Sequence, residues 1–292
     1  MNIEEQLKQK KQAVDGELER MLENDGTRLC QAMRYAVLSG GKRYRPLLAL
    51  LSGESFGIRT EELLPFACAL ELIHNYSLVH DDLPCMDNDE MRRDQPTCHK
   101  AFGEDTALLA GDALLTLAFE VMARTSLAEE LKPRREAAIQ EVGFKAGIQG
   151  MIGGQYLDIT LSPDTLAEDQ LEELILKKTG ALIIASVRVG AILGDASNEQ
   201  LEFMTAYGRN VGLAFQTRDD ILDSSEDRKS NLSARPNSVA LFGQEGAKRR
   251  MERFVKNALE ALDETSIESE GLRFLAVSLL DVLKEKNNES TS

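Results

Sequence analysis

The sequence contains little of what a sheet-rich or disulfide-stabilised protein needs. Its 292 residues include no tryptophan, and aromatic residues account for only 5%. Runs of β-branched residues are few, whereas Leu, Ala, Glu and Lys are abundant, and these residues favour helices. The few cysteines lack the paired spacing of a metal site, so we interpret them as reduced thiols. They are Cys30, Cys68, Cys85 and Cys98.

Positive charge is also scarce. The chain has 34 Lys and Arg residues against 49 Asp and Glu residues, a formal net charge of −15. Nonspecific nucleic-acid binding needs a basic surface, and so does attachment to anionic membranes. We therefore expect neither partner. An acidic protein can still bind a diphosphate where cations or metal ions gather in one cleft.

The sequence begins with MNIEEQLKQKKQ, which is charged and contains no apolar leader. The two most apolar stretches are 107–123 and 179–194, and they contain Asp112, Glu120 and Arg188. Charged residues inside such stretches indicate buried core helices rather than transmembrane segments. We expect a cytoplasmic protein without a transmembrane segment.

Apolar residues recur at helical spacing along most of the chain, and no segment alternates with a period of two. No low-complexity linker divides the sequence. We predict one all-α domain over residues 1–292, a bundle of long helices around a central cavity. Helices are expected from Thr60 to Pro84, and at 105–124, 133–157, 168–193, 197–225, 238–263 and 268–285, with breaks at 153–154, 162–163 and 194–195.

The first acidic cluster follows the helix that ends near Pro84. It contains Asp81, Asp82, Asp87 and Asp89, and Arg92 and Arg93 come directly after it. His74 lies two turns before Asp81, which places both on nearly the same helix face. Carboxylates followed by a double arginine are typical of a metal–phosphate site. The alternative is a solvated acidic loop, but the segment lacks the glycine and the spacing of an EF-hand.

The second acidic cluster is Asp219, Asp220 and Asp223, preceded by the apolar run VGLAF and by Gln216. Asp219 and Asp223 are four residues apart and therefore share a helix face. An exposed acidic pair near a helix end would be the simpler interpretation. Two acidic clusters in apolar segments, however, require a cation between them, and hard oxygen ligands favour Mg²⁺ holding a phosphorylated substrate.

Two further segments carry cations beside glycine. Lys178–Thr179–Gly180 separates a polar helix from an apolar one, and GGKRYRP (40–46) places Lys42, Arg43 and Arg45 on a glycine-hinged turn. Both segments suit a diphosphate. Each also has an ordinary interpretation, a lysine with a capping glycine at a helix C-terminus and a basic surface loop.

Together these segments resemble the trans-isoprenyl diphosphate synthases, especially bacterial short-chain enzymes of the farnesyl and geranylgeranyl type. The matching pieces are GGKRYRP (40–46), ELIHNYSLVHDDLPCMDNDEMRRDQPTCHKAFGE (71–104), LAGDALL (109–115), GGQYLDI (153–159), KKTGALI (177–183) and GLAFQTRDDILD (212–223). They occur in the order typical of the family and span roughly residues 30–225. The resemblance implies an all-α isoprenoid synthase fold, a homodimer, and Mg²⁺-dependent condensation of isopentenyl diphosphate with an allylic diphosphate.

The resemblance also implies roles for individual residues. Metal ions would be held by Asp81, Asp87 and Asp219, supported by Asp82 and Asp223, with Asp220 in the same catalytic cluster. The allylic diphosphate would meet Arg92, Lys178 and Gln216, and Thr179 would help to stabilise its carbocation. Isopentenyl diphosphate would meet Lys42, Arg45, His74, Arg93 and Phe215. Tyr76, five residues before Asp81, resembles the bulky floor that stops growth near C15.

One segment departs from the family pattern. After Asp223 the chain reads SSEDRKSNLSARPNSVALFG, which is shortened and lacks the family's Gly-Lys pair and later aspartate. Lys229 or Arg235 would have to replace the missing lysine. We expect weakened allylic-substrate binding or altered substrate choice, which ordinary KM values for dimethylallyl and geranyl diphosphates would contradict.

Three other functions remain open alternatives: a geranylgeranyl diphosphate synthase, a noncatalytic synthase-like subunit and a class I terpene cyclase. The two intact acidic clusters argue against the subunit. The predicted second-diphosphate clamp argues against the cyclase, which has no isopentenyl substrate.

Overall fold

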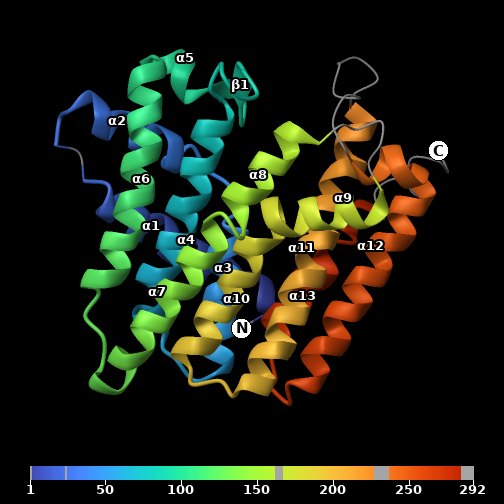
Figure 1. Ribbon diagram of the computed structural model, residues 1–292. Coiled ribbons are helices and arrows are strands. Elements are labelled where there is room, and N and C mark those ends of the chain that lie inside the picture. Colours follow the sequence, from blue (N-terminus) through green and yellow to red (C-terminus); the bar gives the residue numbers. More distant parts are fainter. Residues whose placement is uncertain (1, 24, 162–166, 227–236, 284–292) are drawn as a thin grey trace.

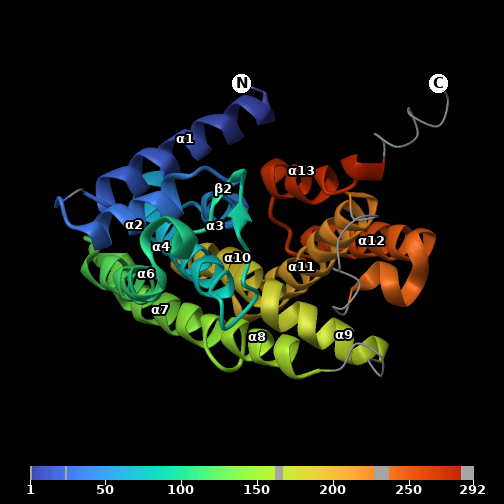
Figure 2. The ribbon, with the colours of Figure 1, turned by 90° about the horizontal axis from the view of Figure 1, so that it is seen from above.

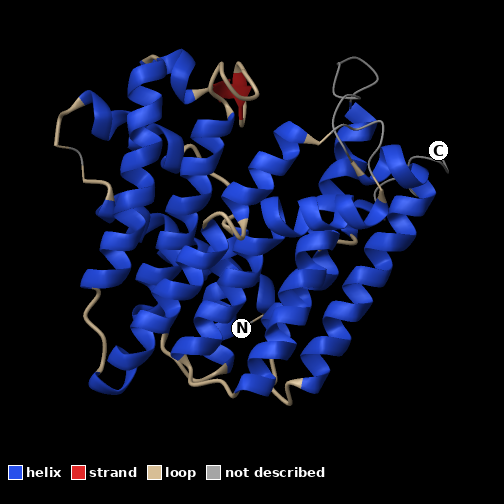
Figure 3. Cartoon of the chain, viewed as in Figure 1, coloured by secondary structure: helices blue, strands red, loops and turns tan. Residues whose placement is uncertain are grey.

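The computed structural model describes residues 2–23, 25–161, 167–226 and 237–283, and over these residues the chain is a bundle of helices (Figure 1). The helices are α1 (Ile3–Met21), α2 (Arg28–Leu38), α3 (Tyr44–Ser55), α4 (Thr60–Asp81), α5 (Cys98–Phe102), α6 (Glu104–Arg124), α7 (Lys132–Ala146), α8 (Met151–Thr160), α9 (Glu168–Ile175), α10 (Ala181–Leu193), α11 (Asn198–Glu226), α12 (Ser238–Glu264) and α13 (Glu270–Ser278). Figure 3 shows how little of the described chain is strand: β1 (Met91–Arg92) pairs antiparallel with β2 (Gln95–Pro96). The predicted all-α class is confirmed.

Helix α10 forms the centre of the bundle, and other helices surround it (Figure 2). It packs against α3, α4, α7 and α11, and almost every one of its side chains is buried. A Cβ atom on Gly190 would lie 2.4 Å from the backbone nitrogen of Gly53, so glycine there lets α10 and α3 touch. This apolar centre holds α4 and α11 in place. Their aspartate-bearing C-terminal ends reach the same end of the molecule, where the β1–β2 hairpin also lies (Figure 1).

The predicted core helices and thiols can be compared with this arrangement. The stretch 179–194 is almost entirely buried, as expected. Helix α6 packs against α4 and α2 through one face. Among the described residues it alone is long and apolar enough to cross a membrane, which by itself is weak evidence for a span. All four cysteines are free.

Two predicted helix boundaries were wrong. The helix expected over 133–157 is broken at 147–150, between α7 and α8, where the backbone is not helical at Gly147 (φ −79°, ψ −157°) and at Gly150 (φ −133°, ψ −122°). No break occurs at 153–154, because both glycines lie inside the continuous helix α8. The helix expected over 268–285 begins at Glu270, after the N-cap Ser269, and is interrupted by a turn at 279–280.

The helix predicted over 168–193 is continuous, but its middle is not α-helical. Residues Leu176–Gly180 form a π-helical segment between α9 and α10. A π-turn inserts one residue into the helix and frequently marks a functional site. Here it contains the Lys178–Thr179–Gly180 segment noted in the sequence.

Candidate active site

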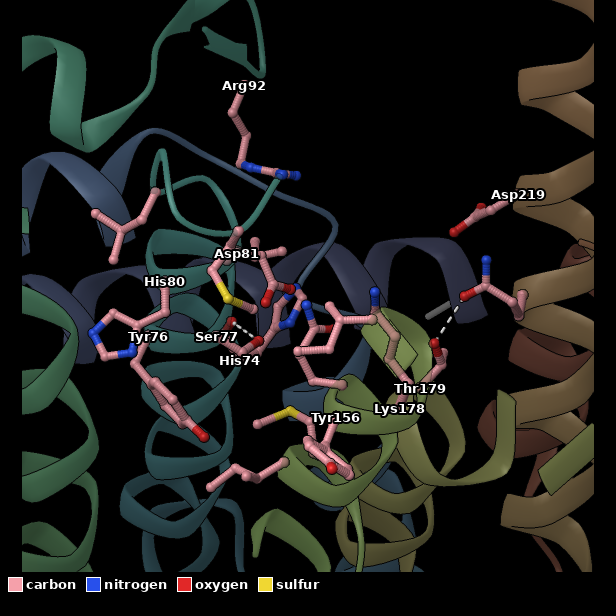
Figure 4. Close-up of a pocket in the computed structure, with 18 of the residues that line it drawn as sticks. His74, Tyr76, Ser77, His80, Asp81, Arg92, Tyr156, Lys178, Thr179 and Asp219 are labelled. Atoms are coloured by element: carbon pink, nitrogen blue, oxygen red, sulfur yellow. Dashed lines mark hydrogen bonds between the residues drawn. The ribbon is translucent and has the colours of Figure 1, made fainter. Parts of the chain in front are cut away.

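A cavity of about 700 Å³, the main cavity, opens between α4, α8, the π-helical segment and α11 (Figure 4). The predicted site residues that line it are Arg45, His74, Tyr76, Asp81, Arg92, Arg93, Lys178, Thr179, Phe215, Gln216 and Asp219. The structure therefore brings together side chains from segments more than a hundred residues apart. In Figure 4, Asp81 and Asp219 lie on opposite sides of the cavity, with Lys178 between them.

Asp81 is the acid of the first cluster that faces the main cavity. It is the last residue of α4, and its carbonyl oxygen accepts a 2.9 Å hydrogen bond from the backbone N–H of Asp87. Burial raises the pKa of Asp81 to about 6, although Lys178 opposes the shift, and Asp87 adds to it. Asp87 is itself partly exposed and is not among the residues that line the cavity.

Asp82 points elsewhere and is almost fully buried, with 2% of its surface exposed. Its Oδ2 accepts a 2.9 Å hydrogen bond from Nε of Arg92, and its Oδ1 accepts a 2.5 Å hydrogen bond from Nη2. Such a forked pair fixes the guanidinium plane. Arg92 also lies 3.5 Å from a carboxylate oxygen of Asp89 and still borders the main cavity. Asp82 thus anchors a cation at the cavity wall.

The second acidic cluster is arranged in the same way. Asp219 faces the main cavity, and burial raises its pKa to about 6 against the opposing charges of Arg218 and Lys42. Asp220 is buried and accepts hydrogen bonds from Gln216 Nε2 (3.0 Å) and from the backbone N–H of Ser238 (2.7 Å). It therefore ties α11 to the first residue of α12. Asp223, one turn further on, is exposed.

The π-helical segment turns two consecutive side chains toward the main cavity. The Thr179 hydroxyl donates a 2.8 Å hydrogen bond to Oε1 of Gln216, the contact drawn as a dashed line in Figure 4. Lys178 borders the cavity beside it, and its Nζ lies 2.5 Å from Oδ2 of Asp158 on α8. The cavity thus has a cation and two amide or hydroxyl dipoles between its acidic walls.

A second space of about 360 Å³, the side cavity, adjoins the main one. The predicted isopentenyl diphosphate residues gather here: Lys42, Arg45, His74, Arg93 and Phe215. Arg45 is buried, and its Nε has no hydrogen-bond partner among the described residues. Burial and the neighbouring arginines hold the pKa of His74 well below its usual value, so this imidazole is neutral at pH 7.

The wall of the side cavity contains a charge network that sequence reasoning missed, and Arg43 and Glu71 both line the cavity. Arg43 Nη1 donates a 2.8 Å hydrogen bond to Glu71, and Arg43 Nε donates a 2.7 Å hydrogen bond to Asp15. Asn75 donates to Glu71, and its carbonyl oxygen lies 3.5 Å from Arg93. The available clue was that Glu71 and Asn75 occupy positions of α4 that helical spacing places in the core. Buried polar groups need partners, so each of them indicated a hidden contact.

The donor set of the main cavity fits Mg²⁺. This ion commonly takes one or two carboxylates and completes its shell with water and substrate phosphates. Asp81 and Asp219 offer one carboxylate from each wall, and both are partly desolvated. Among the described residues, no three acidic, His or Cys side chains form a ready-made metal cluster. A phosphorylated ligand that brings oxygens between the walls would complete such a site.

Comparison with known proteins agrees with this geometry. The family model described as "Polyprenyl synthetase" matches residues 27–232. The chain is 41% identical to farnesyl diphosphate synthase of Escherichia coli (strain K12) over 265 residues, which cover 86% of this chain and 88% of that enzyme. It is 45% identical to the heterodimeric geranylgeranyl pyrophosphate synthase large subunit 1 of Arabidopsis thaliana over 203 residues, which cover 68% of this chain and 55% of that protein.

A solved structure provides the same evidence in three dimensions. The geranyltransferase of Helicobacter pylori, determined with magnesium and isoprenyl diphosphate, superposes with a TM-score of 0.83 at 32% sequence identity, covering 98% of each chain. This likeness confirms the isoprenoid synthase fold. Lys229 and Arg235, the predicted replacements for the missing lysine, lie outside the described residues. The chain belongs to the polyprenyl synthetase family, as the sequence motifs predicted, and is a trans-prenyltransferase that elongates prenyl chains.

Proposed function

We propose that the chain condenses isopentenyl diphosphate with dimethylallyl and then geranyl diphosphate, and releases farnesyl diphosphate in an Mg²⁺-dependent reaction. One observation carries the proposal: a single cavity joins two acidic walls, a set of cations and an apolar depth whose lining includes Tyr76. The acids and cations suit a diphosphate, and the apolar depth suits its hydrocarbon chain.

The allylic substrate occupies the main cavity in this proposal. Lys178 and Arg92 bind its diphosphate oxygens. Asp81, Asp87 and Asp219 hold the metal ions, with Asp82, Asp220 and Asp223 in supporting positions. When bound, Mg²⁺ neutralises charge on the leaving diphosphate as a Lewis acid.

The remaining residues act after the diphosphate has left. The Thr179 hydroxyl, the Gln216 amide and the carbonyl of Lys178 direct their dipoles toward an allylic cation. The side cavity holds isopentenyl diphosphate through Lys42, Arg45, His74, Arg93 and Phe215. Holding both substrates together makes carbon–carbon bond formation effectively unimolecular. The departing diphosphate accepts the proton that restores the double bond.

Tyr76 supports a C15 product. It is 5% exposed, borders the main cavity from α4 and packs edge-to-face against His80. The His80 ring in turn packs against Gly111 of α6. A Cβ atom at Gly111 would lie 2.1 Å from Nε2 of His80, so glycine there makes room for the ring. Substitution Tyr76→Ala removes this floor, and we expect C20 or longer products in place of C15.

A product assay tests the proposal. Purified protein is incubated with Mg²⁺, radiolabelled isopentenyl diphosphate and one allylic primer at a time, and the labelled chains are sized. The expected result is a C15 product from dimethylallyl and geranyl diphosphates, and none after EDTA removes the metal. A C20 product would instead identify a geranylgeranyl diphosphate synthase. Hydrocarbon release without incorporation of label would identify a cyclase, and no reaction a noncatalytic subunit.

A homodimer is also part of this proposal. Exposed large apolar side chains concentrate on one set of neighbouring elements, α6 to α8: Leu108, Leu109, Phe144, Ile148, Ile152, Tyr156 and Ile159. Leu108, Ile152, Tyr156 and Ile159 also line the main cavity. The other three, Leu109, Phe144 and Ile148, mark the association site that we propose. Sedimentation velocity should show a dimer that the exposed-surface substitution Phe144→Glu weakens, and a wild-type monomer would overturn this part.

A further inference from the structure

Helix α8 carries the GGQYLDI segment (153–159) and lies against the π-helical segment. Its Gly154 touches the backbone there. A Cβ atom at Gly154 would lie 2.2 Å from the nitrogen of Lys178 and 2.6 Å from the carbonyl carbon of Lys177, so only glycine allows this approach. Asp158 follows one turn later on the same face of α8. The close approach therefore delivers the Asp158 carboxylate to the Lys178 side chain.

The two members of the resulting ion pair differ in exposure and in their position relative to the main cavity. Lys178 Nζ lies 2.5 Å from Oδ2 of Asp158, whose side chain is 9% exposed, against 27% for that of Lys178. Lys178 borders the main cavity, whereas Asp158 is not among the described residues that line it. Seen from the cavity, the carboxylate lies behind the ammonium group. An ammonium group has three N–H donors, so those that Asp158 does not use remain available to a ligand.

Lysine needs this support because its side chain has many rotamers. Without Asp158, the Lys178 ammonium would be drawn to a carboxylate that lines the same cavity, such as Asp81. An ammonium group drawn to Asp81 would compete with metal ions for that carboxylate. Asp158 thus holds the cation against the α8 side of the cavity and away from the acid wall.

We propose that Asp158 is a positioning residue, which fixes Lys178 so that its remaining N–H groups meet the diphosphate of the allylic substrate. The inference rests on the proposed function of Lys178 in binding that substrate. Losing the rotamer order of one lysine corresponds to roughly a tenfold change in an equilibrium constant. The competing interpretation is an ion pair that only joins α8 to the π-helical segment.

Substitution Asp158→Asn tests the proposal, because the amide keeps the shape but removes the charge. We expect the KM for geranyl diphosphate to rise about tenfold while the KM for isopentenyl diphosphate stays within about twofold. Asp158→Glu, which retains the charge, should recover part of the loss. The matched control is Glu173→Gln, which breaks the 2.8 Å ion pair of the adjacent Lys177 and should change neither KM. Equal rises in both KM values, or no rise, would overturn the proposal.

A double substitution separates positioning from packing. In a Lys178→Ala background, Asp158→Asn should have no further effect on the allylic KM if Asp158 acts only through Lys178. A further loss of about tenfold would show a different role. Thermal unfolding of each variant reports any loss of fold.

Calorimetric binding of inorganic pyrophosphate with Mg²⁺ tests the same contact without turnover. Here Asp158→Asn should weaken binding about tenfold, and unchanged binding would overturn the inference. A wild-type protein that binds pyrophosphate but incorporates no isopentenyl unit would instead count against the proposed function alone.

Discussion

The two acidic walls of the cavity, at the ends of α4 and α11, share the same arrangement. Each presents one aspartate to the cavity, Asp81 or Asp219, and burial raises the pKa of both to about 6. Each also keeps the next aspartate, Asp82 or Asp220, in a buried hydrogen-bonded contact. Consecutive residues on a helix point about 100° apart. A pair of adjacent acids can therefore face a ligand with one member and the surrounding structure with the other.

The walls differ in what the buried member holds. Asp82 pairs with the charged guanidinium of Arg92, which comes from the β1–β2 hairpin. Asp220 binds two neutral donors, the Gln216 amide and the Ser238 backbone N–H. The first wall is thus joined to the hairpin by opposite charges, and the second is joined to α12 by hydrogen bonds. Loss of charge should affect them unequally.

The largest expected effect concerns what the walls have in common. Asp81→Ala and Asp219→Ala should each lower kcat/KM by about 10³-fold, because each substitution removes a carboxylate from one side of a shared diphosphate site. Steady-state assays with geranyl and isopentenyl diphosphates give the values. Glu120→Gln on the exposed face of α6 is the control and should retain full activity. If one of the two alanine variants kept more than a tenth of wild-type activity, the walls would not act together.

The next prediction concerns their difference. Asp82→Asn should lower the free energy of unfolding by about 2 kcal/mol, since it leaves the Arg92 guanidinium without its carboxylate. The value lies below that of a fully buried pair because Arg92 keeps 32% of its side chain exposed. Asp220→Asn should cost about 1 kcal/mol, as its partners are neutral. Urea unfolding of the metal-free protein measures both, and a larger loss at Asp220 would contradict the comparison.

The sequence predicted those features of the site that depend on spacing within one helix. His74 and Asp81 share a face of α4 because they are two turns apart, and both border the main cavity. Gln216 and Asp219, three residues apart, likewise lie together on the inner side of α11. The all-α class followed from composition and periodicity for a similar reason, since both depend on local preference.

The sequence could not predict contacts between distant segments. The buried position of Asp82 depends on Arg92 returning through a hairpin in which Arg93 and Asp94 adopt positive φ angles. The pairing of Lys178 with Asp158 depends on the close approach of α8, which Gly154 permits. The π-turn was missed because its residues have ordinary helical propensity. Its extra residue changes only how α9 and α10 align with each other along the helix, which the sequence does not show.

Seven residues before the cavity-facing aspartate the walls differ again, and this difference gives a pH prediction. The first wall has His74, whereas the second has Gly212, where a Cβ atom would lie 2.7 Å from the Cα of Gly180. Burial holds the pKa of His74 well below 6.5, and the arginines around it from α3 and the hairpin region, Arg45, Arg93 and Arg92, add to the shift.

His74 therefore binds fewer protons in the folded than in the unfolded state once the pH falls below about 6.5. Its contribution to stability is complete above that pH and declines below it, by up to about 1.4 kcal/mol per pH unit. Asp81 and Asp219, whose pKa values are raised, oppose this trend between about pH 4 and 6, so the wild-type profile alone is not diagnostic. The comparison with His74→Asn cancels their contribution.

Urea unfolding at pH 7.0, 6.0 and 5.0 should show the stability difference between wild type and His74→Asn shifting in favour of the variant as the pH falls. A difference that is constant across this range would mean that His74 is protonated as easily in the folded protein as in the unfolded chain, and that the first wall carries no titrating group that the second lacks.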